Sequence, residues 1–224
     1  CCREKRREKA LEPLLLQYFP LIMLKFRDKG VLSTFGALAV LQEVAGLESA
    51  ALWGRVVEEV EGDKLFFRTL ADFLSHTQAN KLEEMRKIEG SNYGIHPCGL
   101  YDPAFLFLHR LLLRLQREAP KKLEDAVRAL KEQKVQVRVS QMVRGLNSKT
   151  DLSPRGLISL LMLLYDLLSI AIWDEFADEE FLVGLVGLLR EGQVETLAEW
   201  PVGFGGGEVG HALRRCASRR CSGT

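Results

Sequence analysis

DLSPRGLISLLMLLYDLLSIAIW, residues 151–173, is the stretch that decides the fold. A helix drawn from Gly156 to Trp173 is apolar on nearly every face, and only Ser159, Asp166 and Ser169 form a thin polar line. A helix on a protein surface needs one apolar stripe, so this helix must be covered on most sides by other helices. We therefore predict an inner helix, packed by the helices of residues 103–146 and of residues 175–199.

Apolar residues recur at helical spacing along nearly the whole chain of 224 residues, and the alternation typical of strands is almost absent. The expected helices are 11–26, 31–45, 47–60, 64–75, 79–88, 103–117, 121–132, 135–146, 156–173, 175–189 and 193–199. Glycine, proline and asparagine residues separate them, and Asp102-Pro103 and Ser153-Pro154 each place a capping side chain before a proline. The sequence predicts an all-α protein.

The helix starts suggest repeats. Asp63 is a third candidate cap, and the distances from Asp63 to Asp102 and from Asp102 to Ser153 are 39 and 51 residues. These values bracket the roughly 40 to 47 residues of an armadillo or HEAT unit. We predict a right-handed α-solenoid of armadillo/HEAT-like helical repeats, with about ten to eleven helices. An irregular helical bundle is the alternative.

Charge divides the chain into three parts. The net charge is only +1, but residues 1–30 carry +4 and residues 208–224 carry +3, so the remainder carries −6. We expect a basic tail at 1–9, a helical-repeat domain at 10–207 and a basic tail with two cysteines at 208–224. Basic ends can hold acidic surfaces such as microtubules or nucleic acid, or they can simply be solvated. We expect no nucleic-acid partner.

The five cysteines form no disulfide framework, and an odd number of them is typical of a reducing, intracellular compartment. The chain begins with Cys1 and its basic start precedes no signal-peptide core, so we expect a fragment of a longer cytoplasmic protein. Asp166 interrupts the one segment long enough to span a membrane. We therefore expect no membrane segment.

Motifs that carry chemistry are missing. The four histidines are scattered, none has a second metal ligand at helical spacing, and the loops of a protein kinase do not occur. We predict a chain without catalytic residues, cofactor, metal or small-molecule substrate. The alternative is an enzyme in a helical bundle, with a site at His96, Cys98 and Tyr101, the only clustered reactive groups.

Two sets of residues are candidates for partner binding. Arg110, Arg114, Arg117 and Lys121 would line one basic face if the helix continued past Pro120. Such a face can dock a partner, be solvated, or pair within the chain with the acidic residues Asp174, Glu175, Asp178, Glu179 and Glu180.

The second set lies in GSNYGIHPCGLYDP, residues 90–103, the longest irregular segment. Long loops on helical scaffolds often bind ligands, which makes Tyr93, His96 and Tyr101 candidates for contact with a partner. Alternatively, the aromatic residues of this segment only hold one helical hairpin to the next.

Three patterns, taken in order, resemble a known family: NYGIHP (92–97) leading to Asp102-Pro103, LSPRG (152–156), and EWP (199–201) leading to GGG (205–207). Together they resemble the C-terminal helical-repeat region of Fused-type serine/threonine kinases, over roughly residues 10–210. The family includes a plant relative that acts in cell-plate formation. The basic segment after Gly207 departs from the pattern, where another apolar helix would be expected.

The resemblance implies a non-catalytic, armadillo-like scaffold that binds kinesin-type motors or microtubule-associated proteins, in cytokinesis, cilia or signalling. It also implies a cytoplasmic, cytoskeleton-associated location and a kinase domain upstream of this chain. No catalytic residue can be carried over, because no kinase motif occurs here.

Overall fold

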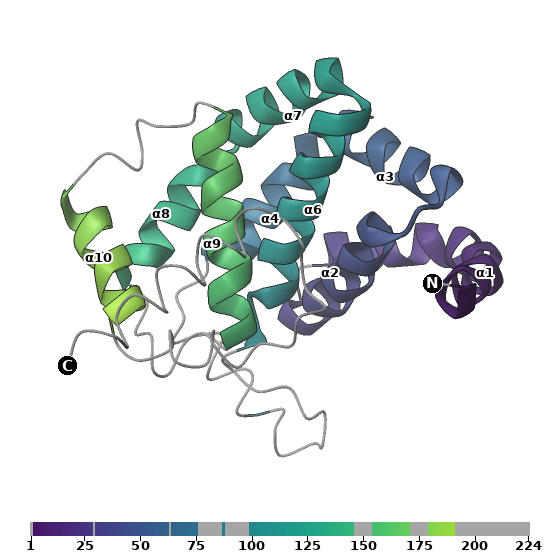
Figure 1. Cartoon of the computed structure of the whole chain (residues 1–224), viewed down its shortest axis with the longest axis horizontal. Coiled ribbons are helices and arrows are strands. Elements are labelled where there is room, and N and C mark those ends of the chain that lie inside the picture. The colour runs from purple at the N-terminus through teal and green to yellow at the C-terminus, as the bar shows by residue number, and fades with distance from the viewer. Residues whose placement is uncertain are drawn as a thin grey trace.

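The structure is a computed structural model that describes residues 2–28, 30–62, 64–75, 87, 99–145, 154–170 and 179–190. All regular structure in these residues is helical and none is strand, which confirms the all-α fold (Figure 1). The helices of this part of the chain are α1 (Cys2–Arg27), α2 (Val31–Gly46), α3 (Ala50–Gly62), α4 (Lys64–Ser75), α6 (Asp102–Glu118), α7 (Pro120–Glu132), α8 (Val135–Gly145), α9 (Pro154–Ser169) and α10 (Glu179–Arg190).

Most helix limits agree with the expected ones. α4 has the predicted bounds, and Pro120 begins α7 after α6 has ended at Glu118. α3 starts later than expected because Oγ of Ser49 accepts a hydrogen bond of 3.2 Å from the backbone N–H of Leu52, which caps the helix. α1 starts earlier and includes residues 2–9, the expected tail. The expected helix 193–199, most of 79–88 and the caps Asp63 and Ser153 lie outside the described residues. The cap predicted at Asp102 is wrong, because Asp102 is the first residue of α6 and Tyr101 precedes the helix without a capping side-chain hydrogen bond.

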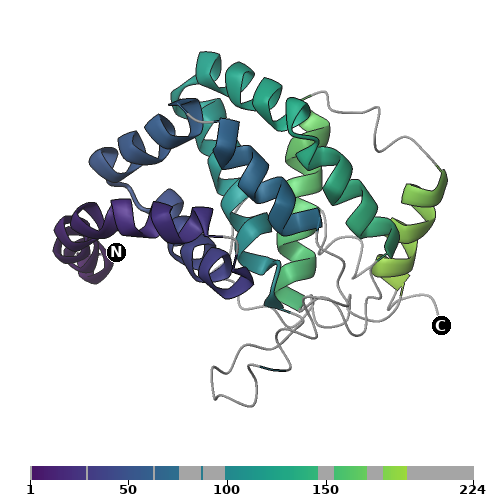
Figure 2. The ribbon, with the colours of Figure 1, turned by 180° about the vertical axis from the view of Figure 1, so that it is seen from behind.

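The helices form two rows. In the first row α2 packs against α6 and α6 against α9, and in the second row α4 packs against α8 and α8 against α10 (Figures 1 and 2). α3 contacts α7 along the upper edge of the rows in Figure 1, and α1 contacts α2, α3 and α4 at one end. α4 therefore lies in the second row, whereas α6 and α9 lie in the first row. The start of α4 does not correspond to the starts of α6 and α9, so the distance between the starts of α4 and α6 is not a repeat length.

An aromatic cluster joins helices that are distant in sequence. The ring centroid of Phe66 lies 4.8 Å from that of Phe26, 5.7 Å from that of Phe107 and 5.5 Å from that of Phe67. All four rings are buried. Since aromatic pairs at such separations stabilise a core beyond their buried area, this cluster holds α1, α4 and α6 together.

The junction between α1 and α2 is closed by a buried hydroxyl. Oγ1 of Thr34 lies 2.8 Å from the carbonyl oxygen of Asp28 and 3.3 Å from that of Phe26. Carbonyls at the end of a helix lack partners within the helix, so Thr34 supplies a donor where α1 ends. Nη2 of Arg27 lies 2.6 Å from Oε2 of Glu59 and ties the same end of α1 to α3.

The apolar helix α9 is mostly buried, as predicted. Leu157, Leu160, Leu163 and Leu167 are covered, and the main contact of α9 is with α6, one of the preceding helices. Its cover is incomplete, because Tyr165 is 57% exposed. The prediction that the following helix also covers α9 is wrong for α10, which packs against α8 instead. A glycine, Gly184, lets α10 approach the backbone of α8 closely.

Candidate partner-binding surfaces

The basic face expected on α6 is divided by the packing of α6 against α2. Nη1 of Arg110 donates a hydrogen bond of 2.5 Å to the carbonyl of Gln42 and lies 3.7 Å from Oε2 of Glu43. Its guanidinium also lies over Gly46, where an added Cβ would come within 2.9 Å of Nη1. Arg110 therefore contacts the last turn of α2 directly.

Arg114 contacts the same end of α2. Its Nη1 donates to the carbonyl of Leu47 at 2.6 Å, and its Nε lies 2.9 Å from Oε1 of Glu118. The guanidinium carbon also lies 4.5 Å from the ring centroid of Trp53. Because cations stabilise the negative end of a helix and bind aromatic faces, both arginines act to hold α2, α3 and α6 together.

Arg117 and Lys121 are exposed, but they lie on either side of the break between α6 and α7. They stay candidates for partner contact. Of the acidic residues considered as internal partners, Glu180 lies 3.7 Å from Arg144, on α8. Asp174, Glu175 and Asp178 lie outside the described residues.

The candidate loop is described only at its end. Tyr93, His96 and Cys98 lie outside the described residues. Tyr101 is 3% exposed, and its ring lies 5.9 Å from that of Phe73 and 6.2 Å from that of Phe105. This contact between α4 and the start of α6 agrees with the alternative in which an aromatic residue joins successive hairpins.

A buried polar pair connects α6 and α9. Nδ1 of His109 lies 2.5 Å from Oδ2 of Asp166, and both side chains are nearly nine-tenths buried. A carboxylate can only accept, so Nδ1–H donates. The sequence analysis missed this pair, because the two residues lie 57 positions apart and Asp166 falls on the thin polar line of its helix. Within the described ranges, no three His, Cys, Asp or Glu residues gather as a metal site would require.

A groove lies between α3 and α7 and encloses about 370 Å³. Its floor is apolar and contains Val57, Val60, Leu115, Ala126 and Ala129. Its rim is charged and contains Glu61, Lys122, Asp125, Arg128 and Glu132.

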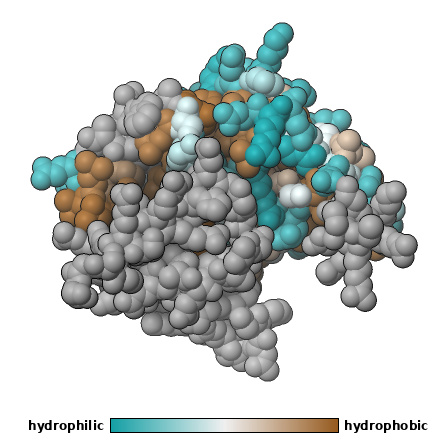
Figure 3. All heavy atoms as spheres, viewed as in Figure 1, coloured by the Kyte–Doolittle hydropathy of each residue, from teal (hydrophilic) through white to brown (hydrophobic). Residues whose placement is uncertain are grey.

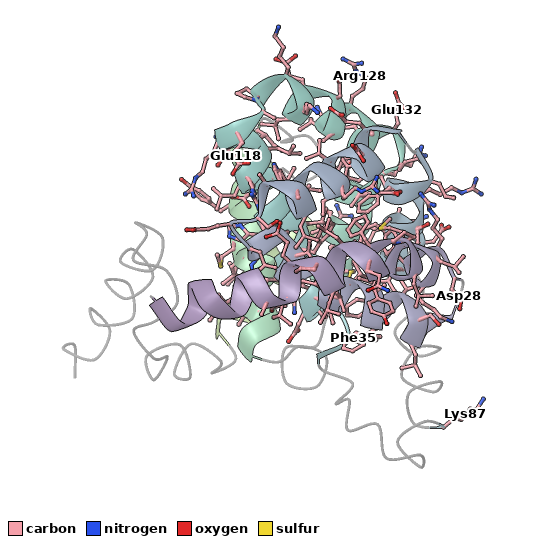
Figure 4. The ribbon with its side chains drawn as sticks, turned by 90° about the vertical axis from the view of Figure 1, so that its right-hand side faces the viewer. Asp28, Phe35, Lys87, Glu118, Arg128 and Glu132 are labelled. Carbon is pink, nitrogen blue, oxygen red and sulfur yellow. The ribbon has the colours of Figure 1, made fainter. Side chains whose placement is uncertain are left out.

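Two ion pairs order the rim of this groove. Nζ of Lys122 lies 3.0 Å from Oε2 of Glu61 across the groove, and Arg128 lies 3.3 Å from Asp125 on one side of it. Arg128 and Glu132 project outward from α7 (Figure 4). The sequence did not single out this groove, because its residues come from three separate helices.

Exposed large apolar side chains in the described part of the chain concentrate on the first helix and on the last two. On α1 they are Leu11, Leu14, Tyr18, Leu21 and Leu24, and beyond α8 they are Tyr165, Leu182, Val183 and Val186. Figure 3 shows this apolar surface over α10, whereas the surface over α7 is hydrophilic. Apolar exposure of this kind marks surfaces that other elements or molecules can cover.

A search of the described helices finds none that is both long and apolar enough to cross a bilayer. In comparisons with known protein families, curated proteins and solved structures, the chain has no match.

Proposed function

We propose that this chain is a non-catalytic protein-interaction scaffold built from stacked helical units. The observation that carries the proposal is the repeated order of helix contacts: α2 meets α6 and α6 meets α9, α3 meets α7, and α4 meets α8 and α8 meets α10. A chain of equivalent units that each contact the next one is the defining property of an α-solenoid. The order supports units of three helices, as in armadillo repeats.

In this proposal the first unit is α2 to α4, the second is α6 to α8, and the third begins with α9 and ends with α10. The resemblance to the C-terminal region of Fused-type kinases fits the same architecture. It extends the proposal to kinesin-type or microtubule-associated partners and to a cytoplasmic, cytoskeleton-associated location.

The groove between α3 and α7 is the proposed site for a partner. It lies where two successive units meet, which is where a stack of repeats presents its continuous surface. An apolar floor inside a charged rim suits a short peptide, because the floor supplies burial while the charges fix orientation. Ala126 and Ala129 leave room above the floor that larger side chains would fill.

Capture from a cell lysate tests this proposal. Bait that carries Ala129→Trp together with Arg128→Glu should capture at least about tenfold less protein than the unchanged chain. The tryptophan fills the groove, and the reversed charge alters the rim of the groove. The captured proteins are quantified by mass spectrometry.

The matched control for this experiment is Arg68→Glu, which reverses an exposed charge on α4, outside the groove. It should retain the same proteins as the unchanged chain. A bait that retains no protein specifically refutes the scaffold, and loss in the control as well as in the groove variant refutes the groove as its site.

A further inference from the structure

The outer flank of α1 carries an apolar seam beside the exposed Leu24, and we define the seam as Leu11, Leu14, Tyr18 and Leu21. Their spacing of three, four and three residues places them along one line of the helix. Each is between 39% and 52% exposed, whereas Phe19, Met23 and Phe26 on the inner side of α1 are buried. α1 thus has two apolar sides, and the fold uses only one.

The position of α1 leaves this seam accessible. α1 packs against α2, α3 and α4 and lies across one end of the two rows (Figure 4). A spacing of three and four residues is the pattern by which one helix packs along another, with each side chain fitting between those of the facing helix. The geometry of the seam therefore fits a single helix.

The charge of α1 indicates which kind of partner helix would fit the seam. α1 contains seven Lys or Arg residues and three Glu residues, a net charge of +4, although the whole chain carries only +1. In the sequence, residues 3–9 contain five cations and two glutamates before Leu11, and Lys25 follows Leu21 at the next position of the same line. The complementary ligand is acidic at both ends.

This distribution disfavours a second copy of the chain. Two α1 helices would bring cations together at both ends, whether they paired parallel or antiparallel, and like charges at an interface oppose association. A lipid surface is the other occupant that the experiment must separate, since a helix lying in a membrane also buries its exposed apolar face, to a depth of about 5–10 Å.

We propose that the α1 seam docks an amphipathic helix of a partner protein that has acidic residues at both of its ends. This surface is separate from the groove between α3 and α7. The inference rests on the proposed scaffold function, because it adds a second binding surface with a defined class of ligand.

The test uses the full chain and a fluorescein-labelled synthetic peptide of about 21 residues, which forms a helix of about six turns. The peptide has leucine at the first and fourth position of each heptad and glutamate at both ends. A second peptide has lysine in place of each glutamate. Fluorescence anisotropy should give the acidic peptide at least about tenfold tighter binding than the basic one.

Variants then locate the site. Leu14→Gln with Leu21→Gln removes apolar contact without adding charge and should weaken binding of the acidic peptide by about tenfold or more. Lys25→Glu should weaken it by about threefold to tenfold through charge alone. Val183→Gln, an exposed apolar residue on α10, is the matched control and should bind as the unchanged chain does. If the double variant does not fold by circular dichroism, Tyr18→Gln replaces it, with an expected loss of about threefold.

Other occupants give different results. Equal binding of both peptides, or binding unchanged by the seam variants, overturns the proposal. So does a dimer that the seam variants dissociate in analytical ultracentrifugation, or seam-dependent binding to vesicles with about 30% phosphatidylserine in the absence of peptide binding. The groove variant Ala129→Trp with Arg128→Glu should still bind the acidic peptide, so failure at the seam is distinguishable from failure of the scaffold.

Discussion

His109 and Asp166 show what a single polar contact does between two apolar helices. Their hydrogen bond is a polar link between the faces by which α6 and α9 meet. A buried polar atom that loses its partner is more costly than the bond itself is favourable. The pair therefore fixes the register of α9 on α6, because a shift of α9 along α6 would separate Asp166 from the imidazole.

Asp166→Ala should lower the free energy of unfolding by about 1–3 kcal/mol, since it leaves the His109 N–H buried without an acceptor. Asp166→Asn keeps an acceptor oxygen and should cost less. Urea denaturation of both variants, and of His109→Ala alone and combined with Asp166→Ala, measures the coupling between the two residues. If the changes in unfolding free energy caused by the two alanine substitutions simply add, the contact does not stabilise the fold.

The arginines of α6 show where reasoning from single residues reaches its limit. Helical spacing correctly placed Arg110 and Arg114 on one side of a helix, but spacing does not tell which neighbour lies beside that side. The carbonyls at the end of α2 come from residues nearly 70 positions earlier. Only the packing of α2 against α6 brings a helix end and two cations together.

At the scale of helices, the sequence predicted type and order well because the signals are local. Apolar periodicity, Pro120 and the glycine at Gly30 act within one or two turns, and the bounds of α4 and α7 followed from them. The start of α3 was missed because Ser49, the capping residue, follows another possible start at Leu47. The pairing of helices depends on residues that are far apart in the sequence, so it could not be predicted from periodicity.

The contact between α8 and α10 depends on the absence of one side chain. A Cβ at Gly184 would come within 2.7 Å of the carbonyl oxygen of Val143, which is backbone and cannot move aside cheaply. Gly184→Ala should therefore lower the free energy of unfolding by about 1–3 kcal/mol, or detach α10 from α8. Thermal denaturation and protection of α10 from hydrogen exchange measure the two effects.

Two other glycines provide controls for that substitution. An added Cβ at Gly36 in α2 or at Gly54 in α3 has no atom within 4 Å. Alanine at either position should raise the stability by about 0.5–1 kcal/mol, because alanine is the better helix former. If Gly184→Ala behaved in the same way, the close approach of α10 to α8 would not exist in solution.

At the scale of the molecule, the sequence correctly predicted that the helix α9 is mostly buried, but it predicted only part of what packs around α9. The apolar residues of α9 required cover, and α6 provides it. Tyr165 and the exposed residues of α10 show that this end of the rows is less covered than the apolar count alone implied. The groove between α3 and α7 could not be predicted, because a cavity depends on the distance between helices and not on their faces alone.

The cluster around Phe66 determines how this molecule comes apart. Its ring touches Phe26 of α1 and Phe107 of α6, so it bridges the first helix and the second group of helices. Stacked helical units can unfold one at a time when each contacts only its neighbours. We expect that α1 and α6 instead exchange their amide hydrogens with the same midpoint in urea, and that Phe66→Ala separates the two midpoints while costing about 3–5 kcal/mol. Cooperativity over the first two thirds of the described chain would then depend on one aromatic ring.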